Sequence, residues 1–561
     1  MRQVKQYIVL LVLGLLAGCF EDEGNYSYKE INPPTWFEEF NDVSPKNIYG
    51  YAGKGEVMVF KGSNMFKWEG DSATRANEVR YEWKIGDVVI GDQLDFEIPT
   101  DELVEKINLK YYSNSQGEWG TFNIIEKETG ITFPARLYVW IYPTFAVYDW
   151  YILSEDNGNS KLSAIRRRTV TELGQTTSSY ELKDNAFEDI NGQKIPGKPI
   201  ALAMETSRDV SPSGACVILT DQVAYEVNLQ NMEKVSEVKD QFLDGTPTNF
   251  NVADLREKAP QSSDEGACTF VATKDGRVFT RIKSVNYLGG QYLTEPYYID
   301  SKGYKITKFG HSMYGGLIPC YDEKNRRIIM ATTWREDVNH GGGQGDYTSV
   351  YRTKMTPLTS NYGVPVDGFP EGTEVLKVTA KNHISWGYGG TTLLFSVYYN
   401  DPTMDGTKTL VGDFSFSNQN QMVTSFGFER WFYLPVKLDE SSVILVSCNN
   451  RYKSEKYADE AKYRDFYTIG NKLYYIQRGK DYYDKTVRFV EFNATFSSKI
   501  TSLAYAYYNL DQLWIGCEDG SIYGYDIRNI NDPKLVCEKK LNGKIVSMKQ
   551  IGWHTSNHDW F

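Results

Sequence analysis

The sequence predicts an all-β protein, in which an N-terminal immunoglobulin-like β-sandwich is followed by a β-propeller of about seven blades. Three observations support this prediction. The composition, with 41 Tyr, 12 Trp and 47 Gly among 561 residues, favours strands and aromatic contact surfaces. Short apolar runs separated by tight polar turns recur along the chain. The length exceeds what one ordinary hydrophobic core supports, so we expect more than one domain.

The charge balance limits the partners of the protein. Its 61 Lys and Arg against 73 Asp and Glu give a formal net charge of −12, and no block of basic residues is present. A nucleic-acid-binding face needs clustered Lys and Arg, so we expect no nucleic acid partner. A hydrophobic fraction of 41% with 24% charged residues is normal for globular domains, which excludes wholesale disorder and a polytopic membrane protein.

The N-terminus has the pattern of a lipoprotein signal peptide. Basic residues precede an apolar run over residues 7–16, which is too short to cross a bilayer as a stop-transfer helix. The run ends in Leu16-Ala17-Gly18-Cys19, which resembles a bacterial lipobox, where the cysteine thiol receives a diacylglycerol. We therefore predict a signal peptide over residues 1–18 and a lipid anchor on Cys19. The alternative is an ordinary signal sequence followed by a buried cysteine.

The residues after Cys19 predict where the anchored protein is displayed. An acidic cluster, Glu21-Asp22-Glu23, resembles the export signal that follows the lipidated cysteine in surface lipoproteins of Bacteroidota. We therefore predict an outer-membrane protein that is held in the membrane lipid through Cys19 and faces the cell exterior. Residues 19–34 are polar and include Pro33-Pro34, so we predict that they form a lipidated tether.

Residues 35–143 are predicted to form the β-sandwich. Residues 80–90 contain two short alternating runs around a Gly-Asp turn, with Trp83 facing the core. A second pair of strands is predicted at residues 120–126 and 135–141, joined by a turn that ends in a glycine. About a hundred residues of such strands, with one Trp in a central strand, suit a β-sandwich.

One short helical stretch is expected within the sandwich. Residues 100–107 have the composition of one or two helical turns. Thr100 or Asp101 is the predicted N-cap, because a side-chain oxygen at this position accepts a hydrogen bond from the first free backbone N–H groups.

Residues 144–561 are predicted to form the propeller, because a strand, a tight polar turn and a second strand recur throughout them. The last copy is the clearest, since Asp519-Gly520 supplies the positive φ angles of a hairpin turn between two apolar runs. Two stacked β-sandwiches are the alternative architecture. The seven predicted hairpins lie at residues 150–165, 216–227, 270–282, 318–331, 392–413, 443–476 and 512–526.

The six internal cysteines are predicted to be buried thiols. None belongs to a C-x-x-C pair, and each lies beside apolar, strand-like residues, so a zinc site is disfavoured. A disulfide framework is the alternative in an exported protein, although an array of this size does not require one. The cysteines concerned are Cys216, Cys268, Cys320, Cys448, Cys517 and Cys537.

These features together resemble the PKD-like lipoproteins of Bacteroidota. The resemblance rests on the lipobox, on Asn25-Tyr26-Ser27-Tyr28 soon after it, on the sandwich, and on a propeller opening with the residues 149–155. The Trp-Asp-Phe-Gly-Asp-Gly signature of typical PKD domains is absent. The resemblance implies an accessory component of loci that encode a SusC-like TonB-dependent transporter and a SusD-like lipoprotein, which import glycans or peptides across the outer membrane.

Catalytic motifs are not found in the sequence. Only five histidines are present; His311 lies in a sequence like a nucleophile elbow, but Tyr314 replaces the glycine that G-x-S-x-G requires. His554 and His558 are spaced as metal ligands would be on a helix, yet the segment has no helical character. No P-loop, dinucleotide fingerprint or complete EF-hand is present. We therefore predict no catalytic residue, no metal site and no cofactor.

The predicted ligand-binding residues are aromatic or polar and lie on glycine-rich loops. His383, Trp386 and Tyr388 precede a predicted blade strand, and neighbouring glycines would let the two rings present flat faces to a ligand. Trp334 and Tyr347 flank a glycine-rich insertion within another blade. A glycan or a peptide can bind to such surfaces. The alternative is that Trp386 packs between blades and that the glycine run is only a loop.

A further insertion, at residues 450–465, is predicted to form a short charged helix. The preferred function is a non-catalytic surface lipoprotein whose propeller presents a ligand-binding face near an import complex. A propeller hydrolase or lyase acting on polysaccharide is one alternative, because the sequence offers too many carboxylates for any pair to be ranked. A purely structural partner of the transporter is the other.

Overall fold

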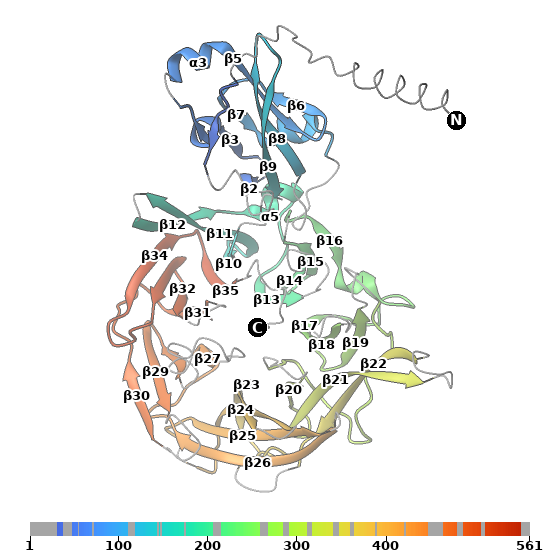
Figure 1. Cartoon of the computed structure of the whole chain (residues 1–561). Coiled ribbons are helices and arrows are strands. Elements are labelled where there is room, and N and C mark those ends of the chain that lie inside the picture. The colour runs from blue at the N-terminus through green and yellow to red at the C-terminus, as the bar shows by residue number, and fades with distance from the viewer. Residues whose placement is uncertain are drawn as a thin grey trace, which may run out of the picture. The chain divides into compact units, whose positions relative to one another are not determined.

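The computed structural model is almost entirely β, and it divides into two compact units (Figure 1). The first unit comprises Met1–Tyr51, Val57–Leu109 and Glu118–Trp140, and the second comprises Ala52–Glu56, Lys110–Gly117 and Ile141–Phe561. The structure describes residues 31–37, 48–53, 55–69, 72–109, 118–142, 145, 148–172, 175–205, 215–229, 231–258, 267–283, 291–310, 317–339, 347–359, 364–386, 390–404, 406–419, 422–446, 464–478, 486–506 and 511–550.

The first unit is built around a five-stranded antiparallel sheet in the order β2-β9-β8-β5-β6. Two shorter sheets, β3-β7 and β1-β4, complete it. Its strands are β1 (Thr35–Trp36), β2 (Ile48–Gly53), β3 (Val57–Lys61), β4 (Phe66–Lys67), β5 (Val79–Ile85), β6 (Val88–Gly91), β7 (Asp95–Pro99), β8 (Glu118–Glu126) and β9 (Thr132–Tyr142). Its helices are the 3₁₀ turn η1 (Gly62–Asn64), α3 (Ser72–Glu78) and α4 (Thr100–Lys106).

Trp83 is fully buried in the core of this unit, as predicted. Its ring lies 4.1 Å from that of Phe122 and 5.1 Å from that of Phe60, measured between centroids, and its indole N–H donates to the Gln93 carbonyl at 2.8 Å. The core therefore brings together strands β3, β5 and β8. Both predicted strand pairs are present, β5 with β6 and β8 with β9.

The predicted helix is present, but its predicted cap is wrong. Helix α4 begins at Thr100, and Pro99 is the N-cap residue, with φ −57° and ψ 134°. Pro99 makes no side-chain capping hydrogen bond, and Thr100, which is buried, already belongs to the first turn of the helix.

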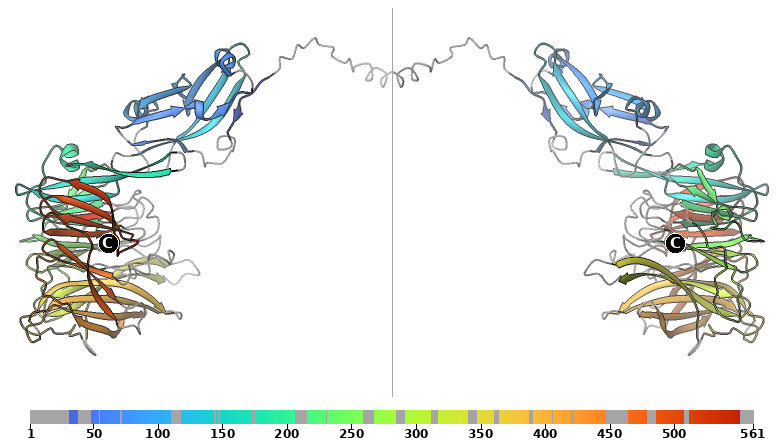
Figure 2. Two further views of the ribbon diagram at one scale, coloured as in Figure 1. Left: turned by 90° about the vertical axis from the view of Figure 1, so that its left-hand side faces the viewer. Right: turned by 90° about the vertical axis from the view of Figure 1, so that its right-hand side faces the viewer.

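The second unit is a ring of seven sheets, which are the blades of a propeller (Figure 1). Figure 2 shows this ring from its sides, with the strands of each blade running through its thickness. Blade 1 contains β10 (Trp150–Asp156), β11 (Asn159–Glu172), β12 (Gln175–Lys183) and β35 (Lys544–Gln550). Blade 2 contains β13 (Pro199–Glu205), β14 (Ala215–Thr220), β15 (Ala224–Asn228) and β16 (Lys234–Glu237). The short helices α5 (Ala186–Asn191) and η2 (Val238–Gln241) lie beside these blades in the chain.

The remaining five blades follow in chain order. Blade 3 contains β17 (Val252–Lys258), β18 (Ala267–Thr273) and β19 (Val278–Lys283), and blade 4 contains β20 (Leu317–Asp322), β21 (Arg327–Asn339) and β22 (Tyr347–Pro357). Blade 5 contains β23 (Glu374–Trp386), β24 (Gly390–Asn400), β25 (Leu410–Gln419) and β26 (Met422–Tyr433). Blade 6 contains β27 (Ile444–Val446), β28 (Arg464–Ile469), β29 (Lys472–Arg478) and β30 (Val487–Glu491). Blade 7 contains β31 (Ile500–Tyr505), β32 (Gln512–Cys517), β33 (Ser521–Asp526) and β34 (Lys534–Lys540).

Six of the seven predicted hairpins are confirmed as neighbouring antiparallel strands. The sixth is wrong in one respect. Strand β28 lies between the two strands that were expected to pair, and it bonds to both of them. The predicted helix at residues 450–465 therefore ends inside a strand, since Arg464 and Asp465 belong to β28. The rest of that predicted helix lies outside the described residues.

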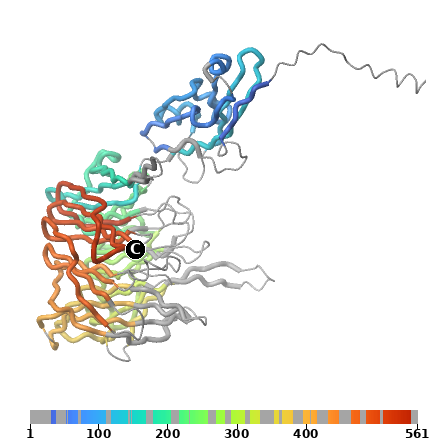
Figure 3. Tube along the Cα trace, turned by 60° about the vertical axis from the view of Figure 1, so that its left-hand side comes forward, coloured from blue at the N-terminus to red at the C-terminus, as the bar shows by residue number. Residues whose placement is uncertain are grey.

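The chain closes the ring by pairing its last described strand with its first propeller strand. Strand β35 bonds to β10, with Trp150 opposite Gln550 and Tyr151 opposite Lys549. The two ends of the propeller sequence therefore share blade 1, and Figure 3 shows red C-terminal segments beside the blue-green start of the propeller. Without this closure, the edge of β10 would present unpaired backbone N–H and C=O groups; β35 pairs with them.

Hydrophobic clusters fill the spaces between blades. Among the described residues there are seven such clusters, one at each boundary between neighbouring blades. Four of the six internal cysteines, Cys216, Cys320, Cys517 and Cys537, are buried in these clusters as free thiols, as predicted. The side chains of Cys268 and Cys448 lie outside the described part of the chain. None of the helices described combines the length and apolarity needed to cross a bilayer.

Candidate functional site

The structure places four of the five sequence-predicted ligand-binding residues on two neighbouring blades, and Tyr388 lies outside the described residues. Trp334 lies in β21, opposite Arg352, and Tyr347 begins β22, opposite Asn339. His383 and Trp386 precede the predicted blade strand, which is β24, as expected. They do not lie on a loop, however: both belong to β23, opposite Leu393 and Gly390 of β24. Their backbone is paired there because β23 is longer than the sequence pattern indicated.

These residues are not brought together by any contact that the structure describes. The side chains of His383, Trp386, Trp334 and Tyr347 lie outside the described part of the structure, as do Tyr388 and the lipidation residue Cys19. Their roles in binding and anchoring remain predictions. The site that the structure does build lies elsewhere, at the centre of the ring.

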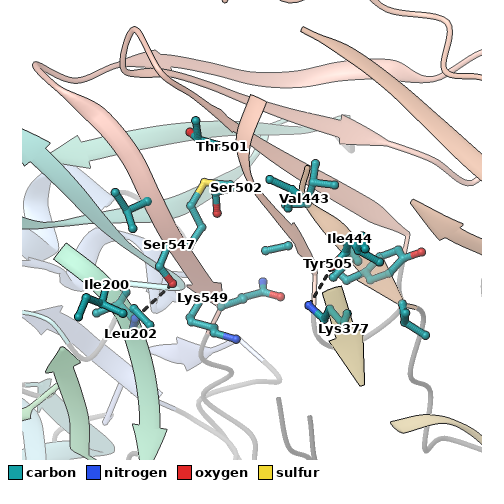
Figure 4. Close-up of a pocket in the computed structure, with 18 of the residues that line it drawn as sticks. Ile200, Leu202, Lys377, Val443, Ile444, Thr501, Ser502, Tyr505, Ser547 and Lys549 are labelled. Carbon is teal, nitrogen blue, oxygen red and sulfur yellow. Dashed lines mark hydrogen bonds between the residues drawn. The ribbon is translucent and has the colours of Figure 1, made fainter. Parts of the chain in front are cut away.

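The central cavity of the propeller has a volume of about 230 Å³ (Figure 4). Six of the seven blades contribute to its wall through their innermost strands, which are β13, β17, β23, β27, β31 and β35 or the residues beside them. Its lining residues are Ile200, Ala201, Leu202, Arg256, Lys377, Val443, Ile444, Leu445, Val446, Thr501, Ser502, Leu503, Ala504, Tyr505, Val546, Ser547, Met548, Lys549 and Gln550.

Three cationic side chains from three blades converge on this cavity. Arg256 comes from β17, Lys377 from β23 and Lys549 from β35. Figure 4 shows the amines of Lys377 and Lys549 directed toward the space between them. Lys549 is positioned by ring closure itself, because its strand is held against β10.

Each cation is held differently. Arg256 Nη1 lies 3.1 Å from Asp254 Oδ1 and donates to the Leu255 carbonyl at 2.8 Å, while its buried Nε has no hydrogen-bond partner among the described residues. Lys377 Nζ donates to the Ile444 carbonyl at 2.9 Å, which links β23 to the neighbouring β27. For Lys549, the described part of the chain offers its amine neither a hydrogen bond nor an ion pair.

Burial lowers the pKa of both lysines. It lowers the pKa of Lys549 to about 7, and repulsion from Arg256 and then Lys377 acts in the same direction. Burial lowers the pKa of Lys377 to about 8, again with repulsion from Arg256. Asp254 opposes both shifts but does not cancel them. Near neutral pH the cavity therefore contains one permanent cation and two lysines whose charge responds to their surroundings.

Asp254 serves mainly to hold Arg256 and the local backbone. Its Oδ1 also accepts the Leu255 N–H at 2.9 Å, and its Oδ2 accepts the Phe309 N–H at 2.8 Å. Both carboxylate oxygens are thus used by neighbouring groups, and Asp254 does not line the cavity. It neutralises at most one of the three cations.

The remaining polar lining consists of hydroxyl groups. Thr501, Ser502 and Ser547 lie on β31 and β35, and Tyr505 lies at the end of β31. No carboxylate lines the cavity among the residues described, so the carboxylate pair that glycoside hydrolysis requires has no candidate there. The described residues also contain no cluster of three or more His, Cys, Asp or Glu suited to a metal ion.

Sequence reasoning missed Arg256, Lys377 and Lys549 because they lie on β17, β23 and β35, the innermost strands of three blades in which it had found only the strands further out. The middle strands are continuously apolar, whereas β35 reads Lys-Ile-Val-Ser-Met-Lys-Gln and its alternation is broken by a register shift against β10 at Leu153. A usable signal was the strand that precedes the predicted hairpins of blades 3 and 5, since β17 contains Arg256 and β23 contains Lys377.

In comparison with known proteins, one family model matches the first part of the chain. Residues 19–199 match the model of the PKD-like family. The match starts at Cys19 and extends through the sandwich to the strands β10, β11 and β12 of blade 1. No curated protein matches the chain.

Several solved structures show distant likeness. AztD of Citrobacter koseri is 12% identical, with a TM-score of 0.31 over 76% of this chain and 94% of that chain. A quinonprotein alcohol dehydrogenase-like protein from Bacteroides thetaiotaomicron is 11% identical, with a TM-score of 0.32 over 93% of this chain and 98% of that chain. The WD40 domain of Pan2 from Neurospora crassa is 7% identical, with a TM-score of 0.34 over 63% of this chain and 82% of that chain. Likeness at this level carries no information on ligand or activity.

Proposed function

We propose that this protein is a lipid-anchored, ligand-binding protein on the outer surface of the outer membrane. In this proposal it is a non-catalytic accessory component of a SusC/SusD-like system that imports a glycan or a peptide. The propeller binds the ligand, the sandwich acts as a spacer or docking module, and Cys19 carries the lipid.

The observation that carries the proposal is the central cavity. Small-molecule sites in proteins are concave and combine apolar walls with a few convergent polar groups, typically in pockets of roughly 300 to 1,000 Å³. The cavity here is about 230 Å³ and presents hydroxyl and cationic groups from several blades on an apolar wall. It therefore suits a small ligand or one end of a longer one.

The anchoring part of the proposal is supported by the sequence around Cys19. The tetrad Leu16-Ala17-Gly18-Cys19 has the residue types of a lipobox, and the PKD-like match starts at the cysteine itself. An acidic cluster follows immediately, which suits display on the cell exterior.

One observation favours a polysaccharide lyase as a second candidate. A lysine whose pKa is about 7 can accept a proton at neutral pH, and Lys549 has this property beside the fixed cation of Arg256. A lyase needs such a base next to a group that neutralises a substrate carboxylate. Binding and turnover must therefore be measured together.

The test incubates the full-length protein with neutral and acidic oligosaccharides and with peptides. Binding is followed by calorimetry, and turnover is followed by mass spectrometry and by the ultraviolet absorbance of unsaturated products. We expect binding to one class without turnover, and recovery of a transporter in pull-downs from the native membrane. Turnover of an acidic glycan would support the lyase instead, and failure of every class to bind would overturn a ligand-binding role.

Anchoring is tested separately. Cys19→Ala should shift the protein from the membrane fraction and remove it from the set of surface proteins cleaved by protease on intact cells. Cys537→Ala is the matched control, because Cys537 is a buried free thiol of the propeller and should leave the location unchanged.

A further inference from the structure

We infer that the central cavity of the propeller binds an oxyanion group of its ligand, a carboxylate, sulfate or phosphate, between Arg256, Lys377 and Lys549. This inference rests on the proposed function and names the chemical class of its ligand. It follows from the charge of the cavity, from the way other buried cations of the propeller are paired, and from the donors that remain free.

The charge of the cavity is opposite to that of the whole protein. The chain has a formal net charge of −12, yet three cations and no carboxylate line the cavity among the residues described. Bringing like charges together in a partly buried site is unfavourable unless an opposite charge joins them. A bound anion would supply that charge.

Other buried cations of the same propeller are paired with carboxylates of the protein. Arg327 is paired with two carboxylates, Asp322 at 2.9 Å and Asp300 at 2.7 Å. Arg281 is fully buried and lies 3.8 Å from Glu226. These arginines have their counter-charges built into the fold.

The cavity lysines lack this arrangement. Among the described residues, neither Lys377 nor Lys549 forms an ion pair with a carboxylate within 4.0 Å. The carboxylate whose charge acts on their pKa values is that of Asp254, which is already paired with Arg256. Lys377 has one carbonyl partner, which leaves two of its three N–H donors for another acceptor. The hydrogen bond from Lys377 to the Ile444 carbonyl joins β23 to β27, but it does not account for the presence of three cations around one cavity.

The donors suit an oxyanion in number and kind. An arginine fork binds planar carboxylate, sulfate or phosphate groups well, and lysine ammonium groups add point charges. Arg256 lines the cavity, and its buried Nε has no partner among the described residues; Ser502 and Ser547, which carry hydroxyl groups, line the same space. The apolar part of the wall, including Leu202 and Met548, can contact the uncharged body of the ligand.

Charge on Lys549 should be coupled to binding. The charged or titratable groups that surround it are Arg256 and Asp254 on β17, Lys377 on β23 and Tyr505 on β31. An anion next to Lys549 stabilises its protonated form and so raises its pKa from about 7. Binding at about pH 7.5 should therefore take up protons from the buffer.

The direct experiment titrates the full-length protein with glucuronate, with glucose 6-sulfate and with glucose as the matched neutral sugar. We expect at least one of the two anionic sugars to bind about tenfold or more tightly than glucose. A preference for one of the two anionic sugars distinguishes a carboxylate from a sulfate ligand. Competition by inorganic phosphate tests whether the cavity also accepts a phosphate group.

The variants locate the site. Lys549→Met and Lys377→Met should each weaken binding of the anionic sugar by about tenfold or more, whereas Lys549→Arg should retain much of it. Lys544→Met is the control, because Lys544 lies exposed on the same strand β35 and outside the cavity. Circular dichroism and thermal unfolding verify that each variant is folded.

The outcomes separate the inference from the proposed function. Equal binding of glucose and both anionic sugars, or anionic binding that Lys549→Met and Lys377→Met leave unchanged, would overturn the inference while ligand binding stands. If neither these sugars nor the neutral glycans and peptides bind, the ligand-binding function itself fails. An absence of proton uptake in calorimetry with buffers of different ionisation enthalpy would contradict placement of the anion against Lys549.

Discussion

Trp150 and Trp514 stack on each other across the boundary between the first and last blades, with ring centroids 4.4 Å apart and an angle of 26° between the ring planes. Trp150 belongs to β10 and Trp514 to β32, and both are almost fully buried. Their cluster also contains Ile545 and Met548 of β35, so it packs on the strand that carries Lys549. Closure of the ring and formation of the cavity are therefore the same structural event.

Replacing Trp514 by Ala should destabilise the propeller by about 3 to 5 kcal/mol, because it leaves a large void and removes the stacked pair. Chemical unfolding followed by fluorescence measures the loss. Trp431→Ala is the control, since Trp431 is 46% exposed on the outer strand β26 and should cost less than about 1 kcal/mol. Equal costs for the two variants would contradict the role assigned to the stack.

Gly543→Ala should prevent proper closure of blade 1. Gly543 has φ +96°, and a Cβ there would lie 1.9 Å from the Glu155 carbonyl oxygen of β10, so both strain and a clash oppose the substitution. Gly158→Ala provides the control, because Gly158 has φ +78° but nothing within 4 Å of an added Cβ. We expect about 1 kcal/mol for the control and several times that for Gly543→Ala in thermal unfolding. Similar losses of stability in the two variants would show that backbone strain at positive φ, and not the clash with Glu155, sets the cost of the substitution.

Asp149→Asn should stabilise the protein at neutral pH. Burial raises the pKa of Asp149 to about 6, against a weaker opposing effect of the Arg167 N–H, which donates to it at 3.3 Å. The folded state therefore binds more protons than the unfolded state between about pH 4 and 6, and stability falls as pH rises through this window.

The expected gain from Asp149→Asn is about 1 to 2 kcal/mol above about pH 6, with little change near pH 4. Denaturant unfolding across this pH range measures it. Asp244→Asn, at an exposed position in the same unit, should change stability by less than about 0.5 kcal/mol. A loss of stability at neutral pH in Asp149→Asn would contradict the assignment.

For the two cavity lysines we expect stability to depend on pH in the opposite direction from Asp149, and at higher pH. Their folded pKa values, about 7 for Lys549 and about 8 for Lys377, are below that of an unfolded lysine, about 10.4. The unfolded state binds more protons in this window, so the free energy of unfolding should rise as pH increases from about 7 to 10. Lys549→Met should reduce that rise and Lys544→Met should not, as measured by denaturant unfolding without added anion.

The repeated strands could be predicted from the sequence because their signals are local. A turn such as Asp519-Gly520, where Gly520 has φ +85°, lies between two apolar runs only a few residues away. The middle strands of the blades are buried on both sides, so their sequences are continuous apolar runs. The β-sandwich core around Trp83 was predictable for the same reason.

The cavity could not be predicted because its parts are distant in sequence. Lys549 lies opposite Tyr151 only after closure of the ring, and Arg256 and Lys377 come from two other blades. The innermost strands β17, β23 and β35 carry charged residues and lack the continuous apolar pattern that identified their neighbours. The predicted aromatic residues Trp386 and Tyr388 followed from loop composition alone, which does not specify where a side chain points.

Anion binding in the cavity can be observed in a crystal structure of the full-length protein grown with selenate, an oxyanion that anomalous scattering locates. We expect an anomalous peak in the propeller cavity within hydrogen-bonding distance of Arg256 and Lys549, which disappears in Lys549→Met. An empty cavity in wild-type crystals that bind selenate at other positions would contradict this expectation.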